Sequence, residues 1–117
     1  MDTFEILSQL CSAAGVSGAE GSAAEAAAKL LEKYGEVTLD NALGSVICKV
    51  GSWEDGKPVM LLDAHIDEIG MIVTYITEDG FLKISGCGGL DTRLLLAQQV
   101  TVYGKEKLTG IVTSTPP

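Results

Sequence analysis

Residues 59–73, VMLLDAHIDEIGMIV, form an apolar run that is interrupted by a cluster of polar groups. Residues 59–64 are almost continuously apolar, which is typical of a central strand covered on both faces. The polar cluster consists of Asp63, His65, Asp67 and Glu68. His65 is the only histidine in the chain. We therefore expect a buried strand that ends at one imidazole with carboxylates around it.

The spacing of His65 and Asp67 suggests a use for this strand end. Side chains two residues apart in an extended chain point to the same side. Ligands of α/β sheets bind at the carboxyl ends of the strands. Asp67 could therefore hold the His65 ring in one tautomer, as carboxylates do beside metal-bound histidines. The spacing predicts that His65 is a candidate metal ligand with Asp67 within hydrogen-bonding reach.

A purely structural interpretation fits the same spacing. A histidine near the end of a strand is often an ordinary polar residue with satisfied hydrogen bonds. Asp63 would then be a turn or edge carboxylate and Glu68 a solvated one. Spacing alone leaves both interpretations open.

Two helices are expected before the first strand. The first has apolar residues at helical spacing and a capping box made by Asp2 and Glu5. The second is alanine-rich, is capped by Ser17 or Ser22, and ends at Gly35. Its face toward a sheet is expected to consist of Ala24, Ala27, Ala28, Leu31 and Tyr34.

The apolar period then changes to two, which predicts strands at residues 36–40, 45–50 and 59–65. Helices combined with such strands indicate a layered α/β domain. After Gly70 the sequence favours two hairpins, over residues 71–86 and 100–115, with no α-helix longer than two turns. This second half is typical of a small β-barrel or sandwich, and we place a domain boundary near Gly70.

The composition indicates which partners the protein can bind and in which compartment it is found. The net charge is −8, with 16 acidic against 8 basic residues, which argues against nucleic acid or an anionic membrane as a partner. No apolar run approaches the ~20 residues of a membrane span. Three cysteines without a CxxC pair favour a reducing compartment, so we expect a cytoplasmic protein. Cys48 is expected in the core, and Cys87 is expected to be the most exposed.

The motifs, taken in order, resemble the tetrahedral aminopeptidases, a family of enzymes with two metal ions at one site. The segments that carry the resemblance are GVSGAEG (15–21), DNALGSVI (40–47), AHIDEIGMIV (64–73), GGLDTRLL (88–95) and STPP (114–117). The histidine motif is highly specific, and the others are weaker singly but occur in the expected order. The resemblance covers nearly the whole chain.

The resemblance implies a role for each residue of the central pair. His65 corresponds to the first ligand of two divalent metal ions, zinc or cobalt, and Asp67 to the catalytic-site carboxylate that orients it. The other ligands and the glutamate that acts as general base lie further along a longer chain. We therefore expect this chain to be part of a longer protein, inactive by itself, with exposed strand edges and only weak zinc binding.

The resemblance also implies the domain organisation. Residues 1–70 correspond to the N-terminal part of a layered α/β metallopeptidase domain. Residues 71–117 correspond to the first part of an inserted, β-barrel-like dimerisation domain. The implied partners are peptide substrates and further copies of the same chain, which form dimers that assemble to a dodecamer. The implied reaction is removal of N-terminal residues from peptides by metal-activated water.

Two other functions are considered. A carboxylate-based glycosidase is one, because some relatives in this family carry a cellulase label. That chemistry needs two acids across a cleft, whereas Trp53 is the only tryptophan and aromatic residues make up 5% of the chain. A non-catalytic assembly module is the other, and it would leave His65 as an isolated ligand.

Overall fold

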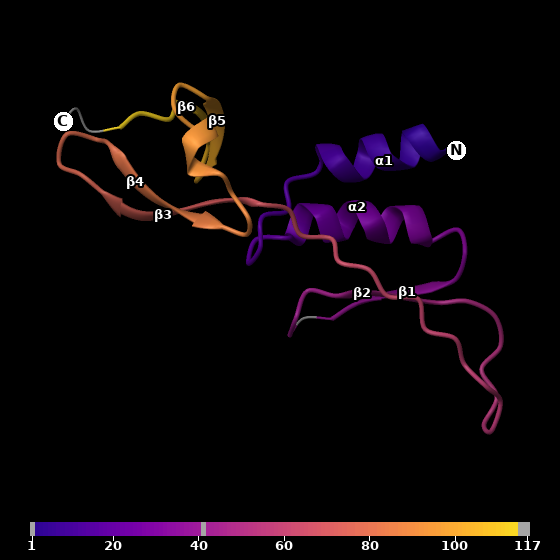
Figure 1. Ribbon diagram of the computed structural model, residues 1–117. Coiled ribbons are helices and arrows are strands. Elements are labelled where there is room, and N and C mark those ends of the chain that lie inside the picture. The colour runs from indigo at the N-terminus through magenta and orange to yellow at the C-terminus, as the bar shows by residue number, and fades with distance from the viewer. Residues whose placement is uncertain (1, 41, 115–117) are drawn as a thin grey trace.

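The computed structural model describes residues 2–40 and 42–114, which form a mixed α/β chain with two separate groups of elements (Figure 1). The first group contains helices α1 (Thr3–Ser12) and α2 (Gly21–Leu31) and strands β1 (Glu36–Leu39) and β2 (Val46–Lys49). The second contains β3 (Gly70–Ile76), β4 (Leu82–Cys87), the 3-10 helix η1 (Thr92–Leu94), β5 (Gln99–Tyr103) and β6 (Lys107–Ile111). Residues 59–69 run between the groups as an extended segment.

The start of α1 is as predicted. Glu5 N donates to Asp2 Oδ1 at 2.8 Å, and Asp2 N donates to Glu5 Oε2 at 3.0 Å, so the capping box is confirmed. The cap predicted for α2 is wrong. That helix has Glu20 at its N-cap without a side-chain cap, because Ser17 bonds elsewhere and Ser22 lies inside the helix.

Small side chains on α2 let it pack closely between α1 and the β1–β2 hairpin. Among the described residues, the buried apolar side chains are Ala23, Ala24, Ala28 and Leu30. Ala24 and Ala28 lie on the predicted face, so that part of the prediction is confirmed. Tyr34 is 56% exposed, because α2 ends at Leu31 and Tyr34 lies beyond its last turn.

Within residues 2–40 and 42–114 the strands form three antiparallel hairpins. The two after Gly70 were predicted as hairpins, whereas residues 36–40 and 45–50 were predicted only as strands. The three hairpins pair β1 with β2, β3 with β4, and β5 with β6. The β3–β4 turn has Gly80 at φ +83°, the left-handed region that glycine adopts readily. Across residues 71–114 the sole helix is the three-residue η1, so the expected lack of a long α-helix is confirmed for the described part of this half.

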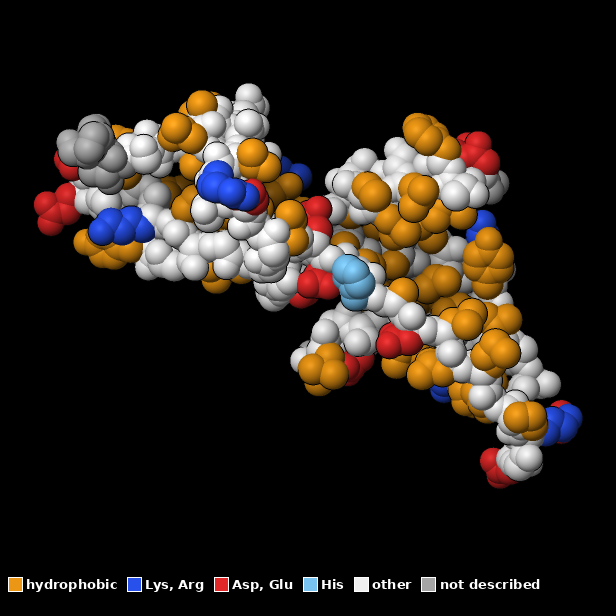
Figure 2. All heavy atoms as spheres, in the orientation of Figure 1, with side chains coloured by type: hydrophobic (Ala, Val, Ile, Leu, Met, Phe, Trp, Pro, Cys, Tyr) orange, Lys and Arg blue, Asp and Glu red, His pale blue; other side chains and the backbone are white. Residues whose placement is uncertain are grey.

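The prediction of a buried central strand at residues 59–65 is wrong. This segment is extended but pairs with no strand in the described part of the chain. Met60, Leu61 and Leu62 are 84%, 85% and 87% exposed. A strand becomes central only when neighbours pair with both of its edges and helices cover its faces, and here β1 and β2 pair only with each other. Figure 2 shows the resulting apolar surface.

The cysteines differ in part from expectation. All three are free, and Cys11 on α1 is exposed, whereas Cys48 and Cys87 are half-buried. Cys87 is not the most exposed, because it lies within β4 opposite Gly70 of β3. None of the helices within residues 2–40 and 42–114 has both the length and the apolar character that crossing a membrane requires.

The two groups of elements do not share one compact core. The radius of gyration is 18.6 Å, whereas a compact chain of this length has about 13 Å. The principal extents are 65 × 31 × 27 Å. The molecule is therefore elongated along the direction in which the two groups follow each other (Figure 1).

A short parallel contact fastens the loop between α1 and α2 to the extended segment. Glu68 N donates to Gly15 O at 2.8 Å, and Gly15 N donates to Glu68 Oε1 at 3.2 Å. Val16 and Glu68 form an isolated parallel β-bridge. Two residues further on, a Cβ at Gly70 would lie 2.4 Å from Val16 Cγ2, so glycine is required for this approach.

We predict that Gly70→Ala lowers the free energy of unfolding by about 1–3 kcal/mol, because the added methyl group overlaps the Val16 side chain. Urea denaturation measures the change. Adding Val16→Ala should recover part of the loss. Gly21→Ala is the control, since a Cβ there meets nothing within 4 Å. An equal effect of the two glycine substitutions would contradict the prediction.

Candidate metal centre

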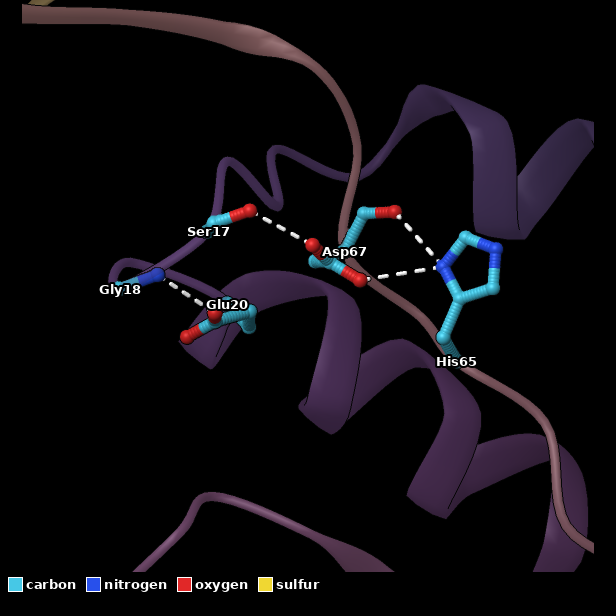
Figure 3. A network of polar contacts seen from close by, with 5 residues as sticks. All are labelled: Ser17, Gly18, Glu20, His65 and Asp67. Atoms are coloured by element: carbon cyan, nitrogen blue, oxygen red, sulfur yellow. Dashed lines mark hydrogen bonds and ion pairs between the residues drawn. The ribbon is translucent and has the colours of Figure 1, made fainter. Parts of the chain in front are cut away.

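The pair predicted from spacing forms at the end of the extended segment. His65 Nδ1 lies 3.0 Å from Asp67 Oδ1 and 3.2 Å from the Asp67 carbonyl oxygen (Figure 3). An ionised carboxylate only accepts hydrogen bonds, so Nδ1 carries the hydrogen, and in the neutral ring the free lone pair is on Nε2. The contact is confirmed, whereas its expected place at the end of a paired central strand is wrong.

The ring of His65 is open to solvent at the junction of the two groups of elements. Its side chain is 86% exposed, and that of Asp67 is 40% exposed. Figure 2 shows the imidazole on the surface, with acidic side chains around it. Nε2 is therefore accessible to an ion or to a further part of a site.

A third residue, missed by the sequence interpretation, completes the contacts of Asp67. Ser17 Oγ donates to Asp67 Oδ2 at 2.6 Å, so the two carboxylate oxygens have different partners (Figure 3). Spacing could not predict this contact, because 50 residues separate Ser17 from Asp67. The signal for this contact in the sequence is the GVSGAEG segment, in which Ser17 is also one of two candidate caps for the second helix.

A tight turn presents the Ser17 hydroxyl to the extended segment. Ala19 N donates to Val16 O at 2.8 Å, and Gly18 has φ +87°. A four-residue turn with a positive φ at its third position is of type II, and Gly18 fills that position without strain. Ser17 occupies the second position, at the exposed corner of the turn.

The remaining carboxylates of the cluster do not converge on His65. Glu68 is directed to the loop after α1, where it accepts from Gly15 N. Asp63 is exposed on the extended segment. Within residues 2–40 and 42–114, no group of three or more His, Cys, Asp or Glu side chains could hold a metal ion.

Hydrogen bonding keeps the Asp67 carboxyl group ionised. The hydroxyl of Ser17, and to a smaller extent the ring of His65, hold its pKa below the ordinary value of 3.8. A carboxylate that stays charged keeps accepting from Nδ1, which fixes the tautomer of His65. His65 and Asp67 thus fit the roles of one metal ligand and the carboxylate that orients it. A zinc site needs three or four protein ligands, so further ligands would be required.

Comparison with known proteins places these residues in a family. The model of the M42 glutamyl aminopeptidases matches residues 44–117. The lysyl aminopeptidase of Pyrococcus furiosus is 28% identical over 119 residues, which cover 100% of this chain and 34% of that protein. This chain therefore spans about a third of the length of that curated relative.

Solved structures agree in fold. The TET aminopeptidase of the marine sediment archaeon Thaumarchaeota archaeon SCGC AB-539-E09 has a TM-score of 0.83 and 34% identity, covering 97% of this chain and 31% of its own. PhTET1-12s, solved as a dodecamer, has a TM-score of 0.82 and 34% identity, covering 100% and 35%. The arrangement of the described elements is thus one that occurs within much longer chains.

We predict that Asp67 titrates below pH 3.8, because both of its partners favour the charged form. Its contribution to stability is present above the unfolded-state pKa and is lost as the pH falls through the lower folded-state pKa. Carboxyl carbon NMR measures the midpoint, with Asp67→Asn to assign the signal and a peptide of residues 63–70, which lacks Ser17, as the reference. A folded-state midpoint at or above that of the peptide would refute the prediction.

Proposed function

This chain belongs to the M42 glutamyl aminopeptidase family, and from that premise we propose that the protein containing it is a metal-dependent aminopeptidase. The observation that carries the proposal is the His65–Asp67 contact. It places the hydrogen on Nδ1 and leaves Nε2 available at an exposed position. An imidazole held in this way is ready to bind a divalent ion.

The roles of the two residues follow from this geometry. His65 would hold one of two divalent ions, zinc or cobalt, through Nε2. Asp67 would retain the hydrogen on Nδ1, fix the ring plane and make Nε2 a stronger donor of its lone pair. When bound, the ions supply Lewis acidity toward the peptide carbonyl and activate water at neutral pH. The remaining ligands and the general base would come from other parts of the protein.

The proposed substrates are peptides with a free amino terminus, from which one residue is removed at a time. The family model carries a glutamyl name and the Pyrococcus furiosus relative a lysyl one, so members differ in the residue they remove. Our proposal is limited to the class of reaction.

We further propose that residues 1–70 belong to the catalytic layered α/β domain and residues 71–117 to an inserted, β-barrel-like dimerisation domain. The change of element type at Gly70 supports this division, since both hairpins β3–β4 and β5–β6 follow it (Figure 1). The proposed partners are further copies of the same chain, in dimers that assemble to a dodecamer. The proposed location is the cytoplasm.

No observation favours the glycosidase alternative. Asp67 is engaged by Ser17 and His65, and Glu68 by Gly15, so these acids do not face each other across a cleft. Trp53 contacts Lys49, whose Nζ lies 5.6 Å from the ring centroid. The exposed apolar surface suits assembly, which a multi-subunit peptidase also requires.

We predict that His65→Gln in the whole protein lowers kcat/KM on peptide p-nitroanilides by about 100-fold or more, since a metal ligand is lost. Asp63→Asn should retain activity within about 3-fold, because the hydrogen bonds and the ion pair of His65 in the described structure are with Asp67 and not with Asp63. Wild-type protein should leave cellulose intact. Cellulose hydrolysis without peptidase activity would reject the proposed reaction in favour of the glycosidase.

Assembly gives a separate prediction. Light scattering of the whole protein at micromolar concentration should show dimers or a dodecamer, because the apolar surface of the β-rich half needs a covering partner. PhTET1-12s provides the dodecameric reference. A monomer as the main species would contradict the proposed assembly.

A further inference from the structure

Ser17 and His65 hold the two oxygens of one carboxylate. Ser17 Oγ donates to Asp67 Oδ2 at 2.6 Å, and Oδ1 lies 3.0 Å from His65 Nδ1. The final side-chain torsion of aspartate has a broad distribution, so a carboxylate that is hydrogen-bonded at only one oxygen can rotate. A second anchor at Oδ2 fixes the carboxylate plane and so keeps Oδ1 at the His65 ring. Figure 3 shows Ser17 and His65 on opposite sides of Asp67.

We propose that Ser17 is a positioning residue, which sets the Asp67 carboxylate and through it the direction in which His65 Nε2 meets a metal ion. This inference rests on the proposed metal-dependent function. Ser17, in the loop between α1 and α2, thereby joins His65 and Asp67, which lie on the extended segment. The Ser17 hydroxyl contacts the Asp67 carboxylate, which in turn contacts the His65 imidazole.

A capping role does not account for the Ser17 hydroxyl. The N-cap of α2 is Glu20, which has no side-chain cap and accepts instead from Gly18 N. A role as nucleophile does not fit either. An activated serine bonds to its base, whereas Ser17 bonds to the carboxylate, and Nδ1 of His65 already faces Asp67.

The backbone on both sides holds this contact in place. The type II turn at Val16–Ala19 fixes Ser17 at its corner, with Gly18 in the left-handed region. The reciprocal bonds between Gly15 and Glu68 fix the loop to the segment that carries Asp67. The hydroxyl is thus presented by a rigid frame, although Ser17 itself is exposed and contributes little to packing.

The test compares three substitutions in the whole protein. Ser17→Ala removes the hydroxyl, Ser17→Thr keeps it, and Ser22→Ala is the control at an exposed serine inside α2. Dissociation constants for Co²⁺ and Zn²⁺ are measured by competition with a chromophoric chelator, together with the visible spectrum of bound Co²⁺. His65→Gln serves as the reference for loss of the ligand itself.

Ser17→Ala should weaken metal binding by about 3- to 10-fold, less than the 10- to 100-fold typical of a direct partner of a metal-bound histidine. The Co²⁺ spectrum should change, because ring orientation alters the ligand field. Ser17→Thr should restore affinity to within about 3-fold of wild type, and Ser22→Ala should stay within about 2-fold. Since Ser17 is exposed, circular dichroism should be that of wild type, and the melting temperature should fall only slightly through the loss of one hydrogen bond.

The outcomes separate the two proposals. If wild-type binding depends on His65 but Ser17→Ala matches Ser22→Ala in affinity and spectrum, the role of Ser17 is overturned and the metal-dependent function stands. If Ser17→Thr is as weak as Ser17→Ala, the hydroxyl is not the cause and the inference also fails. If His65→Gln binds both ions as wild type does, the proposed function and the inference fall together.

Discussion

The structure depends on the reciprocal hydrogen bonds between Gly15 and Glu68. They join the loop after α1 to the extended segment that carries His65. One bond joins two backbone groups, and the other joins the Gly15 backbone to the Glu68 side chain. The approach is close enough to require small residues. Gly15 is buried, and a Cβ there would lie 2.8 Å from Ala23 Cβ. At Gly70 only a hydrogen atom fits in the side-chain position, because a Cβ there would overlap the Val16 side chain.

This contact explains why two glycines and an alanine-rich helix accompany the metal-binding candidate. Ala23 lies on α2 and is 2% exposed, so the helix presses against the same loop that holds Ser17. The loop therefore lies between α2 and the extended segment, since a Cβ at Gly15 would also lie 3.6 Å from the Ile66 carbonyl oxygen. The position of Ser17 relative to Asp67 thus depends on this packing together with the turn at Val16–Ala19 and the bonds between Gly15 and Glu68.

The exposed apolar segment next to the site bears on the surroundings of His65. Residues 59–62 have the composition of a central strand but have neither edge nor face covered in the described part of the chain. Covering such a segment would remove water from the neighbourhood of His65. A drier surrounding strengthens both the hydrogen bonds of Asp67 and the hold of an imidazole on a cation. Covering this exposed segment would therefore also change the surroundings of His65.

Local chemistry in the sequence was enough to predict several elements correctly. The capping box at Asp2, the hairpin turn at Gly80 and the contact of Asp67 with His65 each depend on residues at most four positions apart. The covalent chain keeps such residues close, so their spacing determines whether they can meet. The family, too, could be inferred from the order of its motifs.

The other features depend on contacts between segments that are far apart in the sequence. The bond from Ser17 to Asp67 spans 50 residues, and it exists because the loop at Gly15 is fastened to Glu68. The exposure of Leu61 and Leu62 was likewise invisible in a pattern that reports only that a segment is apolar. The physical reason is the same in both cases. A sequence states which surfaces a residue could bury or bond, whereas the partner that meets it is brought there by the packing of other elements.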